Sequence, residues 1–238
     1  MNLFGVSIEG GDWTRIQRLL REHPSAWIVT ANPEILLHAY DDTTYKEVVR
    51  QADWRTADGT GLVLLARAQG ERIARFPGID LAEQLLHESA SQGLRVALFG
   101  GGAGIADEAV RVWQARLPTL RMRAWSGGHV DDAGEEDEIT RTDREAMLAW
   151  KPDVLLVAFG GNTKQERWIA RSREMFRDIR VIVGVGGTFD VWAGRFARAP
   201  RLFRFLGLEW MWRFFLQPSR FYRMWRATAV FVWRVAWH

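Results

Sequence analysis

The chain has 238 residues, of which 47% are hydrophobic and 26% are charged, and its formal net charge is +3. This composition supports a packed core and excludes an intrinsically disordered chain. The sequence contains no cysteine, which excludes disulfide bonds and cysteine-ligated metal sites.

Short apolar runs alternate with helical periods over most of the chain. This alternation is typical of βαβ units around a mainly parallel sheet. We therefore predict an α/β fold: a Rossmann-like, mainly parallel sheet flanked by helices, with a C-terminal helical appendage. The predicted strands are residues 27–30, 95–99, 121–125, 153–159 and 180–185. The predicted helices are residues 13–22, 33–39, 43–51, 60–68, 79–91, 105–116, 135–150 and 164–176.

The C-terminal segment, residues 195–238, differs from the rest of the chain. It carries nine Arg, no Lys, one acidic residue (Glu209), five Trp and seven Phe. Arg interleaved with aromatic rings suits a surface that binds phosphate and lies against something apolar. Two interpretations stay open: a basic amphipathic tail packed on its own domain, or a site for a phosphorylated, lipid-linked substrate.

The boundary between the two parts is predicted near residue 195, which gives domains 1–195 and 196–238. Pro200 and Pro218 divide the second part into helical pieces, because proline interrupts the helical hydrogen-bond ladder. No apolar run reaches the roughly 18 residues of a membrane span. The N-terminus has no basic segment followed by an apolar one, so we expect no signal peptide.

Ligands of open α/β sheets bind where strands end and helices begin, so the turns after the strands are the places to search. In the first turn, residues 30–34, Asn32 can cap the next helix and Thr30 can face a ligand. In the second, residues 57–61, Asp58 is either the cap of the next helix or a general base for a sugar hydroxyl.

Three further strand-end turns are rich in glycine. Gly100 and Gly101 permit a diphosphate to approach backbone N–H groups, although a tight turn alone explains them as well. The G-x-G-x-x-G spacing with a later acidic residue is missing, which counts against a dinucleotide. A fourth turn leads to Gln165, whose amide can read a base or sugar edge. The fifth turn contains Gly186 and Gly187, and all five could converge on one large cleft.

Several absences constrain the chemistry. No two Asp are separated by a single residue, no Walker-type phosphate loop occurs, and the five His form no i,i+4 pair. We therefore expect no metal and no cofactor. A diphosphate would then be neutralised by Arg, whose planar fork matches phosphate oxygens. Arg213, Arg220 and Arg223 would share one face of a continuous helix, although Pro218 interrupts it.

These motifs, in this order, resemble the WecG/TagA/CpsF glycosyltransferases (glycosyltransferase family 26), and the resemblance covers essentially the whole chain. The matching pieces are TANPE (30–34), ADGTG (57–61), RFPGIDL (75–81), LFGG (98–101), KPDVLLVAFGGNTKQERW (151–168), GVGGTFDVWAG (184–194) and RAP…GLEWMWR…PSRFYR (198–223).

The resemblance implies an inverting, metal-independent, UDP-sugar-dependent hexosyltransferase. Such enzymes move a sugar from a UDP-sugar to a saccharide on a polyprenyl diphosphate, in cell-surface polysaccharide synthesis. By the same resemblance the protein would be cytoplasmic and peripheral on the inner face of the cell membrane, with residues 1–195 binding the nucleotide-sugar and residues 196–238 contacting the membrane. Nucleic acid is not an expected partner, and an assembly of several identical copies is consistent with the exposed aromatics.

The resemblance also assigns roles to individual residues. Asp58 would be the base on the acceptor hydroxyl, with Thr30 beside it. Arg213, Arg220 and Arg223 would bind the acceptor diphosphate. The residues implied in binding the donor sugar or its nucleotide are Asn32, Arg75, Gly100, Gly101, Gln165, Gly186 and Gly187.

Three positions depart from the family pattern. Thr163 stands where many relatives carry Pro, Gln217 stands where Glu is usual, and Gly127–Gly128–His129 replaces a Gly-Tyr pair. N-acetylmannosamine, its uronic acid and glucose therefore all remain open as the donor sugar.

Single features of the sequence also fit two other classes of protein. A nucleotide-binding oxidoreductase is favoured only by the glycine-rich turn at residues 100–104. A nucleic-acid-binding protein could use Arg with stacking rings, but it would leave the Asp58 and Gln165 turns without a role.

Overall fold

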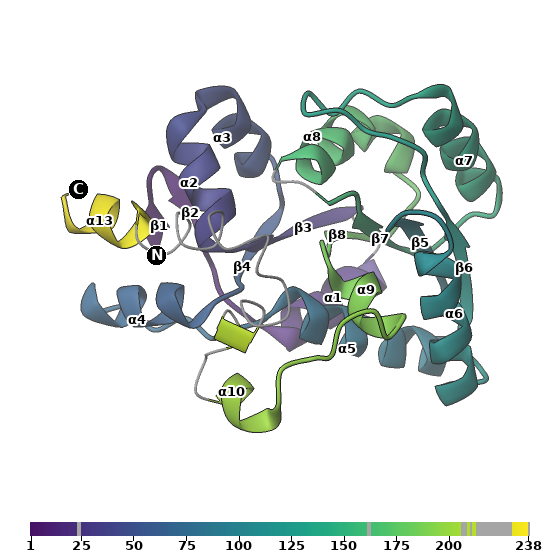
Figure 1. Cartoon of the computed structure of the whole chain (residues 1–238), viewed down its shortest axis with the longest axis horizontal. Helices are drawn as coiled ribbons and strands as arrows, with labels where there is room; N and C mark the ends of the chain where they lie inside the picture. The colour runs from purple at the N-terminus through teal and green to yellow at the C-terminus, as the bar shows by residue number, and fades with distance from the viewer. Residues whose placement is uncertain (23–24, 161–162, 206–208, 210, 213–229, 238) are drawn as a thin grey trace.

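The computed structural model describes residues 1–22, 25–160, 163–205, 209, 211–212 and 230–237. Within them, six strands form one sheet in the order β4-β3-β8-β7-β5-β6, and every neighbouring pair is parallel (Figure 1). The strands are β3 (Ala26–Ala31), β4 (Trp54–Ala57), β5 (Arg95–Gly100), β6 (Arg121–Trp125), β7 (Val154–Ala158) and β8 (Val181–Gly184). The predicted mainly parallel α/β fold is thus confirmed.

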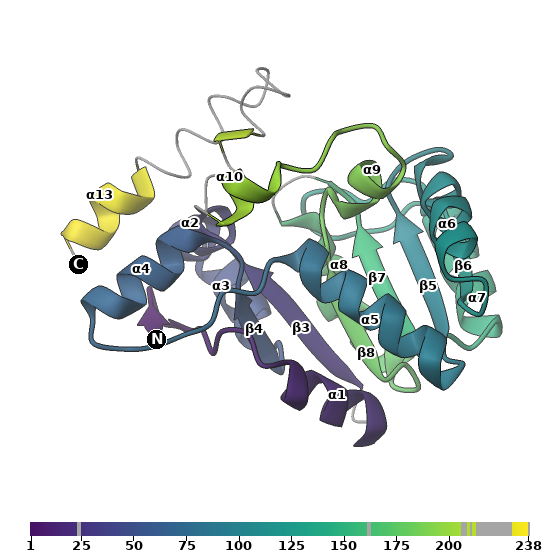
Figure 2. The ribbon, with the colours of Figure 1, turned by 90° about the horizontal axis from the view of Figure 1, so that it is seen from below.

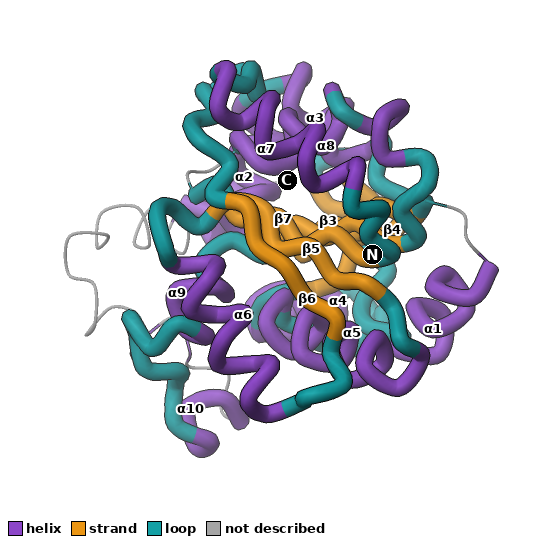
Figure 3. Tube along the Cα trace, turned by 90° about the vertical axis from the view of Figure 1, so that its right-hand side faces the viewer, coloured by secondary structure: helices purple, strands orange, loops and turns teal. Residues whose placement is uncertain are grey.

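Helices cover both faces of this sheet, as the edge-on view of Figure 3 shows. One layer contains α1 (Trp13–Glu22), α5 (Gly78–Gln92), α6 (Ile105–Arg116) and α9 (Thr188–Trp192). The other contains α2 (Pro33–Asp41), α3 (Thr43–Arg50), α7 (Glu138–Ala149) and α8 (Lys164–Arg171). Helix α4 (Thr60–Ala68) follows the edge strand β4, and a short 3₁₀ helix, η1 (Arg173–Phe176), follows α8.

The central strands are buried along their whole length, which is why they read as continuous apolar runs. Successive side chains of a strand point to opposite faces, so each strand contributes to two cores. Val29, Leu155 and Ile182 pack in the core under α2, α3 and α8. Ile28, Leu156 and Val183 pack in the core under α5 and α6. The sheet is therefore fixed from both sides, which holds its strand ends in place.

Several boundaries differ from the sequence-based expectation. The strand β4 and a two-stranded antiparallel hairpin, β1 (Asn2–Leu3) with β2 (Val6–Ser7), were not predicted, because runs of two to four residues carry no clear period. The helix predicted at 135–150 begins at Glu138, since the side chain of Asp137 caps it by accepting from Thr140 N at 2.8 Å. The helix predicted at 164–176 ends at Arg171 and continues as η1.

The described parts of the C-terminal segment are attached to the α/β body. Helix α10 (Arg201–Phe205) lies on the side of the sheet toward which the strands point (Figure 2). Ahead of it, the Arg198 guanidinium contacts both Asp80 and Glu83 on α5. Helix α13 (Phe231–Ala236) packs back beside α2, and its Phe231 ring is buried 6.1 Å from the ring of Phe4.

The division into domains 1–195 and 196–238 stays a prediction. None of the described helices is both long enough and apolar enough to cross a membrane.

Candidate active site

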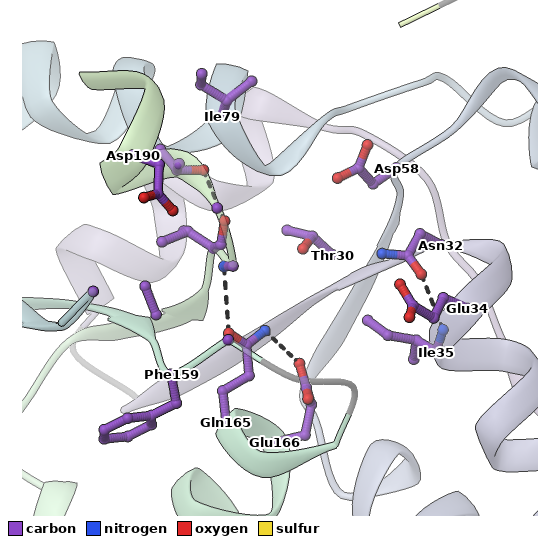
Figure 4. A pocket seen from close by; sticks show the side chains of 17 residues that line it. Thr30, Asn32, Glu34, Ile35, Asp58, Ile79, Phe159, Gln165, Glu166 and Asp190 are labelled. Atoms are coloured by element: carbon purple, nitrogen blue, oxygen red, sulfur yellow. Dashed lines mark hydrogen bonds between the residues drawn. The ribbon is translucent and has the colours of Figure 1, made fainter. Parts of the chain in front are cut away.

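A polar cavity of about 250 Å³ lies at the edge of the sheet where the strands end. All five predicted strand-end turns contribute to its wall, so their expected convergence on one cleft is confirmed (Figure 4). The lining residues are Thr30, Asn32, Glu34, Ile35, Asp58, Ile79, Gly101, Ala158, Phe159, Gly160, Gln165, Glu166, Val185, Gly186, Gly187, Thr188 and Asp190.

Asp58 and Thr30 meet at the start of helix α5. The Asp58 carboxylate accepts a hydrogen bond from the backbone N–H of Gly78 at 3.1 Å. Gly78 has no side chain, and a Cβ there would lie only 3.2 Å from Thr30 Oγ1 and Cγ2. Asp58 is half-buried, whereas Thr30 is buried and donates its hydroxyl hydrogen to the Gly184 carbonyl at 3.1 Å. The structure thus brings the two predicted catalytic residues together at one wall of the cavity.

The capping interpretation of Asp58 is wrong. The residue at the cap position of helix α4 is Gly59, which makes no side-chain hydrogen bond to the helix end. The carboxylate is instead directed toward the start of α5, at the cavity (Figure 4). This leaves the interpretation of Asp58 as a base, which the geometry of the cavity permits.

Asn32 caps helix α2, as predicted: its side-chain oxygen accepts from Ile35 N at 2.9 Å. The residue also lines the cavity, together with Glu34 and Ile35 of the first turn of that helix. The capping bond fixes the direction of the Asn32 amide, so its nitrogen is the part that a ligand could meet.

Gln165 lies at the floor of the cavity in the first turn of α8 (Figure 4). Its amide nitrogen donates to Glu166 Oε1 at 2.7 Å, and its amide oxygen accepts from the backbone N–H of Gly186 at 3.3 Å. The Glu166 carboxylate is buried and also accepts from the hydroxyl of Tyr45 at 3.2 Å, and burial raises the pKa of Glu166.

Three of the four glycines predicted to bind the donor line the cavity, and one does not. Gly101, Gly186 and Gly187 line the cavity, and Gly100 does not. Gly100 has a positive φ of 98°, and a Cβ there would lie 2.5 Å from the Ala158 carbonyl oxygen. The close approach of β5 and β7 excludes a side chain here, and the positive φ is what a tight turn after β5 requires, so the structure of the turn accounts for Gly100.

The predicted arginines lie apart from the cavity wall or beyond the described residues. Arg75 is not a lining residue. Its guanidinium contacts the carboxylate of Glu209 and donates to the Arg204 carbonyl at 3.0 Å. Arg213, Arg220 and Arg223 lie outside the described residues. The sequence had assigned Arg75 to the donor sugar or its nucleotide and the other three to the acceptor diphosphate, and both assignments stay predictions.

Several lining residues were not singled out from the sequence. Glu34 and Asp190 stand at the ends of two of the predicted strand-end turns, and this position in the turn could have identified them as lining residues. With Asp58 and Glu166 they make four carboxyl groups on the wall, and none of the described lining residues is Arg, Lys or His. Among the described residues, no three His, Asp or Glu side chains are grouped in a way that could hold a metal ion.

A parallel α/β sheet with a polar cavity at its strand ends defines a class of proteins that bind a ligand at that edge. The comparison with known families specifies which. Residues 1–238 match the Glycosyl transferase WecG/TagA/CpsF family, and the chain belongs to it. The protein is therefore a glycosyltransferase that transfers a hexose, which sets aside the oxidoreductase and nucleic-acid-binding alternatives.

Two relatives carry the same functional name, N-acetylglucosaminyldiphosphoundecaprenol N-acetyl-beta-D-mannosaminyltransferase. The protein from Bacillus spizizenii is 34% identical over 206 residues, which cover 86% of this chain and 77% of the relative. The protein from Staphylococcus aureus strain MRSA252 is 34% identical over 211 residues, which cover 88% and 79%. The resemblance recognised from the sequence motifs is thereby confirmed.

Proposed function

We propose that this protein is an inverting, metal-independent transferase that moves a hexose from a UDP-sugar to a saccharide on polyprenyl diphosphate. The observation that carries the proposal is the meeting of Asp58 and Thr30 at Gly78, on the wall of a cavity that also holds Gln165. The names of the relatives, which describe mannosaminyl transfer to a lipid-diphosphate N-acetylglucosamine, support this substrate class.

In the proposed reaction Asp58 is the general base. It takes the proton from the acceptor hydroxyl while that oxygen attacks the anomeric carbon of the donor sugar. The new C–O bond forms as the bond to the UDP oxygen breaks, and UDP leaves with the electron pair, so the anomeric configuration inverts. A carboxylate is suited to this step because it accepts the proton as the hydroxyl becomes more acidic in the transition state.

The leaving diphosphate needs positive charge, and the cavity wall described above supplies carboxylates instead. The N–H groups of Gly101 and Gly186 already donate to the Ala158 carbonyl and to Gln165 Oε1, so the N–H of Gly187 is the one in these glycine turns that we propose contributes a partial charge. We assign the full charges to Arg75 on the donor side and to Arg213, Arg220 and Arg223 on the acceptor diphosphate. Since the sequence lacks the D-x-D pair that holds a divalent ion on a sugar nucleotide, the arginines take over this role.

Residues 196–238 are proposed to bring the enzyme to its lipid-linked acceptor at the cytoplasmic face of the membrane. Three large apolar side chains of the described segment are exposed: Leu202 by 63%, Trp233 by 61% and Trp237 by 78%. Trp beside Arg is the composition of segments that lie at the headgroup level of a bilayer. The exposed rings support a peripheral contact of this kind.

The test is a transfer assay with UDP-N-acetylmannosamine and a short-chain prenyl-diphosphate N-acetylglucosamine, followed by UDP release and by mass of the product. We expect a disaccharide on the lipid, with the β-anomer formed from an α-donor, and an unchanged rate in EDTA. UDP-glucose and the uronic acid form of the donor are run in parallel to identify the sugar. No transfer from any of the three donors, or a strict metal requirement, would contradict the proposal.

A further inference from the structure

A chain of buried polar groups runs behind the floor of the cavity. The Tyr45 hydroxyl donates to Glu166 Oε2 at 3.2 Å, the Gln165 amide nitrogen donates to Glu166 Oε1 at 2.7 Å, and Gly186 N donates to Gln165 Oε1 at 3.3 Å. The three side chains are 0%, 2% and 8% exposed in the order Tyr45, Glu166, Gln165. The chain thus links helix α3, helix α8 and the turn after β8.

This arrangement fixes the orientation of the Gln165 amide. If the amide turned by 180°, its oxygen would face the Glu166 oxygen and its NH₂ group would face the Gly186 N–H. Both hydrogen bonds would then become repulsive contacts between like groups in a buried site. Glu166 therefore determines which edge of the Gln165 amide is presented to the cavity.

The frame around the amide is closely packed. A Cβ at Gly184 would lie 2.7 Å from Gln165 Nε2, so the amide rests against bare backbone of β8. Next to it, Arg167 of α8 pairs with Asp42, the cap of α3, at 2.6 Å. Helices α3 and α8 are thus joined by two neighbouring contacts. The Asp42–Arg167 ion pair is partly exposed, and the Tyr45–Glu166 hydrogen bond is buried.

We propose that Glu166 is a positioning residue for transfer: it orients the Gln165 amide toward the donor and, through that amide, holds the Gly186 turn. Both of its carboxyl oxygens are engaged by protein groups, so it acts through Gln165 and not on the substrate. The identity of the ligand rests on the function proposed above. The hydrogen-bond chain Tyr45–Glu166–Gln165–Gly186, which we call the relay, is a property of the protein alone.

The activity test compares Glu166→Gln with Glu166→Leu. Glutamine keeps an oxygen that accepts from Gln165 and an NH₂ group that can donate to Tyr45, whereas leucine offers neither. We expect Glu166→Leu to lower kcat/KM about 10- to 100-fold, because a reacting group misplaced by about 1 Å has an effect of this size. Glu166→Gln should recover most of the activity. The fold of each variant is checked by circular dichroism.

A double-mutant cycle with Gln165→Ala separates positioning from an independent role. If Glu166 acts through Gln165, adding Glu166→Leu to Gln165→Ala lowers kcat/KM no further. Losses that multiply would overturn the proposal, as would wild-type activity in a folded Glu166→Leu variant. Should leucine prevent folding, Tyr45→Phe replaces it in the cycle. Tyr45→Phe is expected to lower kcat/KM about 3- to 10-fold, because one hydrogen bond is missing. In the Gln165→Ala background this substitution must lower kcat/KM no further.

A readout without activity keeps this proposal distinct from the proposed function. The side-chain NH₂ resonances of Gln165 and the backbone amide of Gly186 are followed by ¹⁵N NMR in the full chain. Glu166→Leu should shift both signals, and Glu166→Gln should leave both near their wild-type positions. Unshifted signals in the Glu166→Leu variant would overturn the positioning role of Glu166. Shifted signals together with a wild type that transfers no sugar would contradict the proposed function alone.

Discussion

The cavity and the C-terminal segment carry opposite charge. Four carboxyl groups line the cavity, and none of the described lining residues is cationic. Residues 195–238 carry nine Arg and one acidic residue. A wall of carboxylates is suited to accepting a proton from a sugar hydroxyl and repels a diphosphate, while an arginine-rich segment does the reverse. We infer that neither region is complete as a transferase site and that the proposed reaction needs both.

Ion pairs attach the C-terminal segment to the α/β body outside the cavity wall. The single acidic residue of the C-terminal segment, Glu209, pairs with Arg75, which forms an isolated β-bridge with Ala57 at the end of β4. Arg198 makes the reciprocal connection, because it extends from the segment to Asp80 and Glu83 on α5. The segment is thus held near the strand ends by ion pairs, and the following variants test what each region contributes.

The largest effect is expected from removing the basic region. Truncation after Arg195 should lower kcat/KM for a prenyl-diphosphate acceptor by about 10³-fold or more, since three charge-assisted hydrogen bonds at about 1.5–3 kcal/mol each would be lost. The same variant should no longer float with anionic vesicles. Circular dichroism verifies that residues 1–195 stay folded. Full activity of the truncated, folded form would show that the cavity is sufficient by itself.

Single substitutions test whether Arg213, Arg220 and Arg223 each contact the acceptor diphosphate. Arg213→Gln, Arg220→Gln and Arg223→Gln should each raise the acceptor KM about 10- to 100-fold, as expected for one charge-assisted hydrogen bond. The donor KM should stay within about threefold, because these side chains are assigned to the acceptor diphosphate. Arg201→Gln, on the exposed start of α10, is the matched control for loss of charge. An equal rise of the acceptor KM in all four variants would mean that the segment acts only as a general basic surface.

The attachment of the segment is tested at Arg198. Arg198→Gln leaves Asp80 and Glu83 without the guanidinium that both contact, and we expect the free energy of unfolding to fall by roughly 1–3 kcal/mol. Urea unfolding followed by tryptophan fluorescence measures this change. Arg201→Gln again serves as the control and should change it by no more than about 0.5 kcal/mol. No difference between the two variants would mean that Arg198 does not anchor the segment.

The smallest effect concerns the buried carboxyl of the cavity. Burial raises the pKa of Glu166 above its ordinary value of 4.5, so the folded state binds this proton more tightly than the unfolded state. The resulting stabilisation is complete below pH 4.5 and is lost as the pH rises through the folded pKa. The stability of the wild type relative to Glu166→Gln should therefore fall over this range in urea unfolding. A difference independent of pH would contradict the burial of an ionisable group there.

Much of this site could be predicted from the sequence, because strand ends of a parallel sheet must share one edge. That rule located Thr30, Asp58 and Gln165, which come from three separate turns. It could not locate Tyr45, which is 121 residues before its partner Glu166 and lies on α3, the second helix after β3. Capping preferences were decisive for Asn32 and misleading for Asp58, since a carboxylate near a helix start fits a cap and a cavity equally well.

The central claim is that the cavity carboxylate Asp58 activates the acceptor hydroxyl, and Asp58→Asn tests it most directly. Asparagine keeps an oxygen that can accept from Gly78 N, so the wall should stay intact while the base is lost. We predict that kcat for sugar transfer falls about 10²- to 10⁴-fold, with UDP affinity by calorimetry within about threefold of the wild type. Turnover within about a factor of three of the wild type, in a folded variant, would contradict the account.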